Sequence, residues 1–146
     1  MKPEQEAYVR LLRAADAMQR DMELLLKRHE LSPAQFNVLR ILRGAGEDGL
    51  PSGQVAERMI TRDPDVTRLL DRLEARGLIE RGRRPGDRRV VSACVTKAGL
   101  ALLKRLDNPV FRRHIAQFKP LNPSELASLI ALLTRLCDRK GGRRIQ

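Results

Sequence analysis

Apolar residues near the start of the chain follow the spacing of one helix face. They recur at intervals of three and four in the series Tyr8, Leu11, Leu12, Ala15, Met18, Met22, Leu25 and Leu26. Because an α-helix turns once every ~3.6 residues, this spacing places all of them on one side. We therefore predict one long amphipathic helix over roughly the first thirty residues.

Two further helices share a start signal made of an apolar residue, a capping residue and a proline. In LSPAQF at 31–36, Ser32 is placed as the N-cap, Pro33 occupies the first helical position, and Gln35 can complete a capping box. The sequence LNPSEL at 121–126 repeats this arrangement with Asn122 and Glu125. The first signal predicts a helix that ends near position 44. The second predicts a last helix with the apolar face Leu126, Leu129, Ile130, Leu133 and Leu136.

Between these signals, the chain has the pattern of a turn, a short helix and a longer helix. The glycine-rich segment AGEDGLPSG predicts a turn, after which Ser52 can cap a short helix that reaches Met59. Asp63 is the expected N-cap of the next helix, with Pro64 at its first position. Apolar residues at 66, 69, 70 and 73 give this helix a buried face. Gly77 is expected to end it in a Schellman motif that brings positions 73 and 78 together.

The pattern then changes from helix to strand. The segments LIERGRR at 78–84 and RRVVSACV at 88–95 are separated by a turn at 85–87, which predicts a β-hairpin. Thr96 is expected to cap a fifth helix that carries Leu100, Leu103 and Leu106. Pro109 should either kink or end that helix, because proline lacks a backbone donor and crowds the preceding turn.

Short helix, turn, longer helix and hairpin follow one another in the order of a winged helix-turn-helix. We predict a mainly α fold with a small β-hairpin, in one domain over residues 1–146. Residues 32–96 would form a winged-helix DNA-binding lobe, and residues 1–31 and 97–146 would be dimerisation helices. The leucine stripes of the first, fifth and sixth helices are expected in an apolar core, and the long first helix must also cover its face against a partner. The candidate dimerisation residues are Leu11, Met18, Leu126, Leu129, Leu133 and Leu136.

The charge distribution indicates what the hairpin binds. Lysine and arginine number 29 against 18 acidic residues, and the net charge of +11 attracts polyanions. A hairpin that closes on a glycine turn can project Arg84 and Arg88 toward phosphates or a narrow minor groove, with Asp87 between them able to hold their side chains. The candidate wing residues are Arg83, Arg84, Asp87, Arg88 and Arg89. The alternative interpretation is a disordered basic loop.

The longer helix presents a polar face opposite its apolar one. In a winged helix the N-terminal half of this helix enters the major groove, where Arg68 can make a bidentate contact to guanine. Pro64 and Thr67 could touch thymine methyl groups. In the alternative interpretation, Arg68 pairs with Asp65 or Asp71 on its own helix. The candidate recognition residues are Asp63, Pro64, Asp65, Thr67, Arg68 and Arg72.

Other chemistries lack the residues that they need. Cys94 and Cys137 are too few for a disulfide framework; they indicate a reducing cytoplasm, and we interpret them as small buried residues rather than redox switches. His29 and His114 have no second ligand at metal-binding spacing and are interpreted as helix-end and surface residues. No cofactor loop, nucleophile with a base, or metal set is present, which argues against an enzyme. No apolar segment approaches the ~20 residues of a membrane span, so a soluble cytoplasmic protein is expected.

The segment DVTRLLDRLEARGLIERGRRPGDRRVVSACVTKAG resembles the MarR family of multiple-antibiotic-resistance regulators. The run DRR before a β-strand is a fairly specific signature, and the order of helices matches across nearly the whole chain. The resemblance implies an obligate homodimer, held by the first helix and the last two, on a pseudo-palindromic promoter site. It implies that Arg68 and its neighbours read the major groove while Arg84 and Arg88 reach the minor groove.

The resemblance also bears on regulation. Members commonly release DNA when a small, often aromatic or phenolic ligand binds between the dimer helices and the DNA-binding lobe, or when a cysteine is oxidised. The chain has only the aromatic residues Tyr8, Phe36, Phe111 and Phe118 and lacks the N-terminal cysteine of the peroxide-sensing members. A small-molecule effector is therefore compatible with the resemblance, but the residues themselves do not support one.

These patterns predict a sequence-specific transcriptional regulator, most simply a repressor. Its expected partners are double-stranded DNA, a second copy of the chain and a small-molecule effector, with no cofactor, metal or membrane. The alternative function is a non-specific architectural DNA-binding protein, which the basic charge would equally permit.

Overall fold

The computed structural model describes residues 1–84 and 86–138, which form six helices and a small antiparallel sheet. In chain order the elements are α1 (Pro3–Lys27), α2 (Pro33–Ala45), β1 (Leu50–Pro51), α3 (Ser52–Arg58), α4 (Val66–Ala75), β2 (Ile79–Arg84), β3 (Asp87–Val95), α5 (Lys97–Phe118) and α6 (Pro123–Cys137). The predicted fold class, mainly helical with a β-hairpin, is confirmed.

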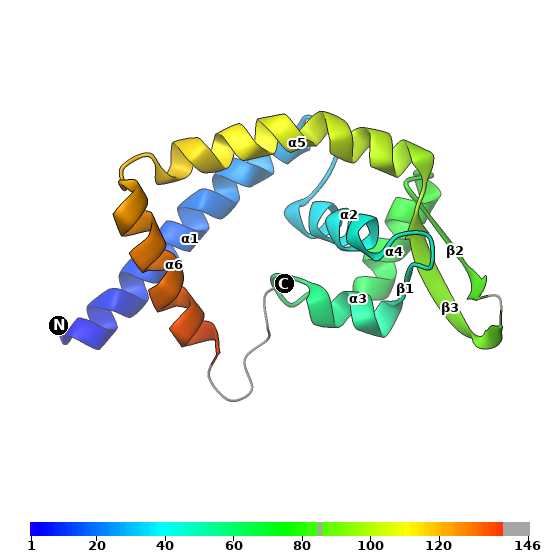
Figure 1. The fold of residues 1–146 in the computed structure, drawn as a ribbon, viewed down its shortest axis with the longest axis horizontal. Helices are drawn as coiled ribbons and strands as arrows, with labels where there is room; N and C mark the ends of the chain where they lie inside the picture. The colour runs from blue at the N-terminus through cyan, green and yellow to red at the C-terminus, as the bar shows by residue number, and fades with distance from the viewer. Residues whose placement is uncertain (85, 139–146) are drawn as a thin grey trace.

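A lobe of short elements lies at one end of the long helices. Figure 1 shows α5 passing over α1, with α2, α3, α4 and the sheet gathered beside one half of α5. The hairpin β2–β3 projects from this lobe. The N-terminal half of α1 and all of α6 lie at the opposite end of the chain's long axis (Figure 1).

The start signals of three helices form the local hydrogen bonds that were expected. Ser32 Oγ accepts a hydrogen bond from the backbone N–H of Gln35 at 3.1 Å. In turn, Gln35 Oε1 accepts one from the backbone N–H of Ser32 at 3.0 Å. Asn122 and Glu125 make the same reciprocal pair at the start of α6. Thr96 Oγ1 accepts from the N–H at position 99 at 3.1 Å. These bonds satisfy N–H groups that have no partner inside the helix.

The start of α4 differs from the prediction. Its N-cap is Asp65, whose Oδ1 accepts a hydrogen bond from the N–H of Arg68 at 2.9 Å. Asp63 instead accepts from the N–H of Asp65 at 2.8 Å, which forms a turn just before the helix. The expectation of Asp63 as N-cap and Pro64 as first helical residue is therefore wrong. Because Asp63 bonds to the residue two positions on, the helix begins at Val66.

The start of α3 also differs, because a short strand precedes it. Leu50 and Pro51 pair in antiparallel fashion with Ala93 and Ser92, so that the sheet order is β1-β3-β2. This pairing keeps Pro51 extended, with φ −61° and ψ 151°, and makes it the N-cap of α3. Ser52 is the first helical residue and caps nothing, so its predicted role is wrong. The sequence pattern predicts the hairpin alone, without this third strand.

The end of α4 is the expected Schellman motif. Gly77 has φ +71°, in the left-handed region that favours glycine. Its N–H donates to Glu74 O at 2.9 Å, and the N–H of Leu78 donates to Leu73 O at 3.0 Å. Both leucines are buried, so the motif joins α4 to β2 through apolar packing as well as hydrogen bonds.

Helix α5 continues through its proline. Pro109 lies inside the helix and is exposed, so the carbonyl that it leaves without an N–H partner can be solvated. The helix therefore does not end at this point. Leu103 and Leu106 are buried as predicted, whereas Leu100 is exposed and was wrongly assigned to the buried face.

The apolar core lies in the lobe and in the adjoining parts of α1 and α5. From α1, Met22, Leu25 and Leu26 are buried, all near its C-terminal end. No residue of α6 is buried. The expectation of core leucine stripes is therefore correct for the end of α1 and for α5, and wrong for α6 and for the N-terminal half of α1. Among residues 1–84 and 86–138, nothing buries those faces.

Candidate nucleic-acid interface

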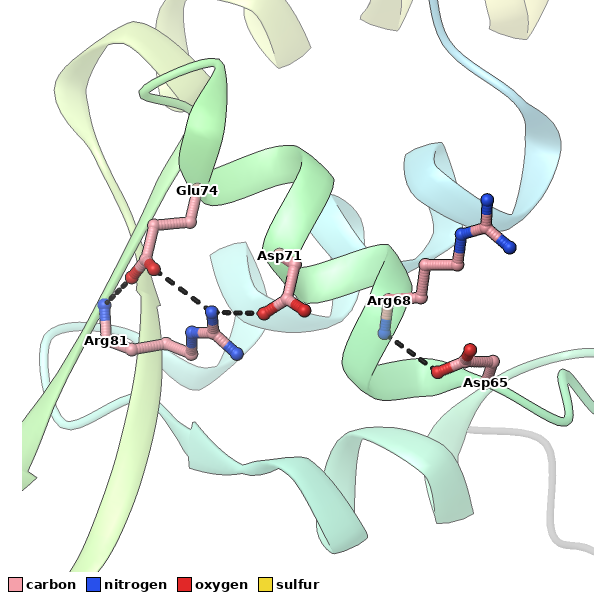
Figure 2. A network of polar contacts seen from close by, with 5 residues as sticks. All are labelled: Asp65, Arg68, Asp71, Glu74 and Arg81. Atoms are coloured by element: carbon pink, nitrogen blue, oxygen red, sulfur yellow. Dashed lines mark hydrogen bonds and ion pairs between the residues drawn. The ribbon is translucent and has the colours of Figure 1, made fainter.

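Helix α4 carries two exposed arginines one turn apart. Arg68 and Arg72 have exposed side chains, and within the described residues neither guanidinium has a hydrogen-bond or ion-pair partner. Asp65 bonds to the backbone of Arg68 and not to its side chain, as Figure 2 shows. Asp71 pairs with a different arginine. The alternative in which Arg68 is held by acids of its own helix is therefore wrong.

The remaining predicted recognition residues lie around the start of the helix. Thr67 is exposed in the first turn of α4, and Asp65 caps it. Asp63 and Pro64 lie in the preceding turn, outside the helix. The structure thus brings these residues together with Arg68 at the N-terminal end of α4.

The hairpin has an irregular tip. The register shifts between Arg83 and Arg84, so that Arg83 faces Val91 while Arg84 faces Asp87. Asp87 Oδ1 accepts from the N–H of Arg89 at 3.1 Å, and Arg83 and Arg89 are exposed. A bulge of this kind twists a hairpin and turns its side chains out of the regular alternation.

Part of the predicted wing lies outside what the structure describes. The side chains of Arg84 and Arg88 and the whole of Pro85 are not among the described parts. The expectation that Asp87 orients Arg84 and Arg88 therefore stays a prediction. The described contact of Asp87 is with the backbone, within the strand that it begins.

Arg81 makes the most extensive polar network of the lobe. Its Nη2 lies 2.5 Å from Asp71 Oδ1 and 3.0 Å from Glu74 Oε1, and its backbone N–H donates to Glu74 Oε2 at 3.0 Å (Figure 2). The side-chain hydrogen bond from Arg81 is the main cause that lowers the pKa of Glu74 below its ordinary value, and the charge of Arg81 adds to it; burial and Asp71 act in the opposite direction.

The sequence did not indicate this network. Arg81 lies in residues 76–89, a stretch with six arginines against two acids, and it was not among the candidate DNA-binding residues. A local signal existed, since Asp71 and Glu74 are three positions apart and therefore neighbours on one side of α4. The path of β2 alongside α4, which only the structure shows, brings Arg81 within reach of Asp71 and Glu74.

The predicted dimerisation residues are all exposed or half-buried. Met18, Leu126, Leu129 and Leu133 are half-buried. Leu11 and Leu136 are 44% and 54% exposed, and Ile130 and Leu132 on α6 are similarly open. Uncovered leucine and isoleucine on one short helix are unfavourable in water, because each exposes apolar area that burial would remove.

The described residues offer little support for other chemistry. Among residues 1–84 and 86–138, no group of three or more His, Cys, Asp or Glu could hold a metal ion. None of the helices in this described part combines the length and apolar character needed to cross a membrane. Cys94 and Cys137 are half-buried rather than fully buried, and Cys94 Sγ donates to the carbonyl of Glu47 at 3.2 Å.

Comparisons with known proteins agree with this geometry. The chain matches the MarR family over residues 29–90. The homoprotocatechuate degradative operon repressor of Escherichia coli is 30% identical over 84% of this chain and 83% of its own. A MarR transcription factor of Planctomyces limnophilus is 43% identical, with a TM-score of 0.72 over 92% of this chain and 97% of that one.

A structure with DNA is also similar. A MarR mutant of Escherichia coli in complex with operator DNA is 27% identical, with a TM-score of 0.80 over 91% of this chain and 95% of that one. Sequence, helix order and hairpin are thus shared along nearly the whole chain. The chain therefore belongs to the MarR family of winged-helix transcriptional regulators, which are not enzymes.

Proposed function

We propose that this regulator is a homodimeric repressor that binds a pseudo-palindromic promoter site and releases it when a small ligand binds. Residues 32–96 form the DNA-binding lobe in this proposal, and residues 1–31 and 97–146 form the dimer helices. The observation that carries the proposal is that the molecule has two different surfaces, one in the lobe and one at the opposite end of its long axis (Figure 1). One is basic and includes Arg68 and Arg72, whose guanidinium groups have no partner among the described residues, and the other is apolar and exposed in the described part of the chain.

The apolar surface supports the dimer. Helix α6 has no buried residue, yet its leucines recur on one face. The N-terminal half of α1, which carries the exposed Leu11, lies at the same end of the molecule (Figure 1). A second copy would cover both, and a two-fold dimer places two equivalent lobes on one DNA duplex. Such symmetry requires an operator with two half-sites.

The basic surface supports sequence-specific binding. Arg68 and Arg72 are exposed on α4 without a partner among the described residues, so each guanidinium is available to a base edge or a phosphate. The hairpin next to α4 adds the exposed Arg83 and Arg89. The repressor activity of the Escherichia coli relative supports the direction of regulation.

A hollow between the helices supports the effector. Its volume is about 130 Å³, and its walls include Met22, Leu26 and Phe36 together with Arg40 and His114. A closed apolar cavity of ~150 Å³ can hold benzene. This hollow is close to that size but open to solvent, and its apolar walls could contact one aromatic ring. Arg40 lies with Cζ 5.8 Å from the centre of the Phe36 ring, where it could pair with a ligand carboxylate. We therefore assign it to a monocyclic aromatic acid.

Footprinting on a genomic fragment library tests the function. We expect protection of one palindrome, with Arg68→Ala weakening that site by about 1–3 kcal/mol while binding to random duplex is unchanged. Arg112→Ala, which removes an exposed arginine of α5, is the matched control. It should leave the affinity for the palindrome and the affinity for random duplex unchanged. Uniform protection of all fragments would instead identify a non-specific architectural protein.

The effector is tested separately by titration with benzoate. Saturable binding that Arg40→Gln weakens, together with release of operator DNA, is the expected result. Binding that Arg40→Gln leaves unchanged would contradict the assigned site.

A further inference from the structure

Arg81 is a basic residue of the hairpin whose described side-chain hydrogen bonds and ion pairs all go to α4. Its side chain is 25% exposed, and Nη2 is engaged by Asp71 and Glu74 together. A guanidinium held by two carboxylates is a poor phosphate ligand, because the competing anions are already in place. The position of Arg81 between the two DNA-binding elements therefore needs a different explanation.

We propose that Arg81 is a positioning residue that fixes the hairpin against the recognition helix, so that both can engage one operator half-site. This inference rests on the proposed function. Arg81 itself does not touch DNA in this arrangement. It acts through Asp71 and Glu74, the two residues of α4 that accept its hydrogen bonds.

The geometry of the contacts supports a rigid link. One residue of β2 is attached to α4 twice, by its backbone N–H to Glu74 Oε2 and by its guanidinium to Glu74 Oε1. A third bond reaches Asp71, almost one helical turn further toward the N-terminus of α4. A single hydrogen bond would allow β2 to pivot about the contact. Attachment to two residues of the helix, Asp71 and Glu74, opposes that rotation.

The connection between the elements shows why a link is useful. Only residues 76–78 join α4 to β2, and they belong to the Schellman turn. This turn fixes where the hairpin begins, but the strand extends to position 84, beyond the reach of the turn's own bonds. Arg81 lies midway along β2 and is thus placed to set the direction of the outer half of the hairpin.

Removing either carboxylate tests the positioning role, because this role and a direct DNA contact by Arg81 predict opposite changes in operator affinity. Asp71 and Glu74 are negative charges on a helix that faces a polyanion, so simple electrostatics predicts that removing them strengthens DNA binding. If Arg81 were a DNA contact, freeing it from these acids would strengthen binding further. If Arg81 positions the hairpin, removing either acid breaks the link and weakens specific binding.

We would measure the affinity of the full-length protein for its operator and for random duplex by fluorescence anisotropy. Asp71→Asn, Glu74→Gln and Arg81→Met should each weaken operator binding by about fivefold or more and leave random duplex binding unweakened. Glu80→Gln is the matched control: it removes one exposed acid next to Arg81 that has no polar partner among the described residues. It should bind the operator as well as or better than the wild type.

The conservative variant Arg81→Lys separates the roles further. Lysine keeps the charge, but its side chain is one atom shorter than the path to Arg81 Nη2, which contacts both carboxylates. The positioning role therefore predicts operator binding weaker than the wild type. A phosphate contact would be largely retained by lysine. Stronger operator binding by Asp71→Asn and Glu74→Gln, or full activity of Arg81→Lys, would overturn the proposal.

A measurement without DNA keeps this proposal distinct from the proposed function. The shifts in urea midpoint caused by Arg81→Met and Glu74→Gln should be clearly non-additive in the double variant, while Arg81→Met and Glu80→Gln should add. Additive shifts for the first pair would show that the link contributes nothing and would overturn the inference. A wild type that does not distinguish operator from random duplex would contradict the proposed function, and the urea cycle would still decide whether the link exists.

Discussion

Nη1 of Arg43 on α2 donates hydrogen bonds to both carboxylate oxygens of Asp107 on α5, at 3.0 and 3.1 Å. The pair connects the lobe to the long helix that supports it. A second polar link joins the long helices themselves, where Arg113 on α5 pairs with Asp21 on α1. Both pairs lie at the edge of the apolar core, so they align elements that the core already holds together.

The Arg43 pair should make a small contribution to stability. Its side chains are 33% and 51% exposed, and water screens such pairs strongly. We expect Arg43→Gln to lower the free energy of unfolding by about 0.2–1 kcal/mol in urea denaturation. Arg105→Gln, an exposed arginine of the same region without a described partner, should have no effect. Equal shifts for the two variants would show that the pair is not a specific contact.

Gly77→Ala should destabilise the lobe by about 1 kcal/mol, because a Cβ disfavours the left-handed backbone that ends α4. Thermal unfolding followed by circular dichroism measures the change. Gly53→Ala is the control, since Gly53 is helical and a Cβ there meets no atom within 4 Å. It should be neutral or slightly stabilising. A neutral Gly77→Ala would contradict the structural requirement for glycine.

Glu74 should make stability depend on pH in the acid range. Its folded pKa is lowered, chiefly by the hydrogen bond from Arg81, so its contribution is present above its ordinary value of 4.5 and is lost as the pH falls through the lowered pKa. The difference in urea midpoint between wild type and Glu74→Gln should therefore be constant near neutral pH and shrink below about pH 4.5. A difference that grows with acidity would contradict the sign of the shift.

Leu133→Asp should convert a dimer into monomers. The substitution would place an unpaired charge in the centre of the α6 apolar face, which is unfavourable in a dry interface. Sedimentation velocity at micromolar concentration measures the outcome. Ser128→Asp adds the same charge to an exposed position on α6 and should leave the dimer intact. A wild type that sediments as a monomer would refute the dimer.

The wing should supply part of the salt dependence of binding. Arg84→Ala combined with Arg88→Ala removes four cations from a dimer, and each lost phosphate contact should reduce the slope of log K against log salt by about 0.9. The slope should thus become shallower by up to about 3.6. The double variant Arg105→Ala/Arg112→Ala removes as many cations from α5 and should leave the slope unchanged. Superimposable curves for the wing variant and wild type would show that this hairpin does not contact DNA.

The sequence by itself determined those features that rest on interactions between residues close in the chain. The capping boxes at Ser32 and Asn122, the Thr96 cap and the Gly77 motif were all predicted correctly. Each depends on hydrogen bonds that span no more than five residues, so the local residues are sufficient to specify it. The periodicity of the leucines likewise identified the helices, and the family resemblance gave the fold.

The tertiary structure decided everything that depends on which distant groups meet. It paired Pro51 with β3 as a third strand. It directed Arg81, which lies in the basic stretch of the hairpin, to the acids of α4. It also left α6 uncovered, although its stripe looks like that of a core helix. A charge or an apolar stripe fixes what a residue can bind, but only the path of the whole chain fixes which partner is within reach.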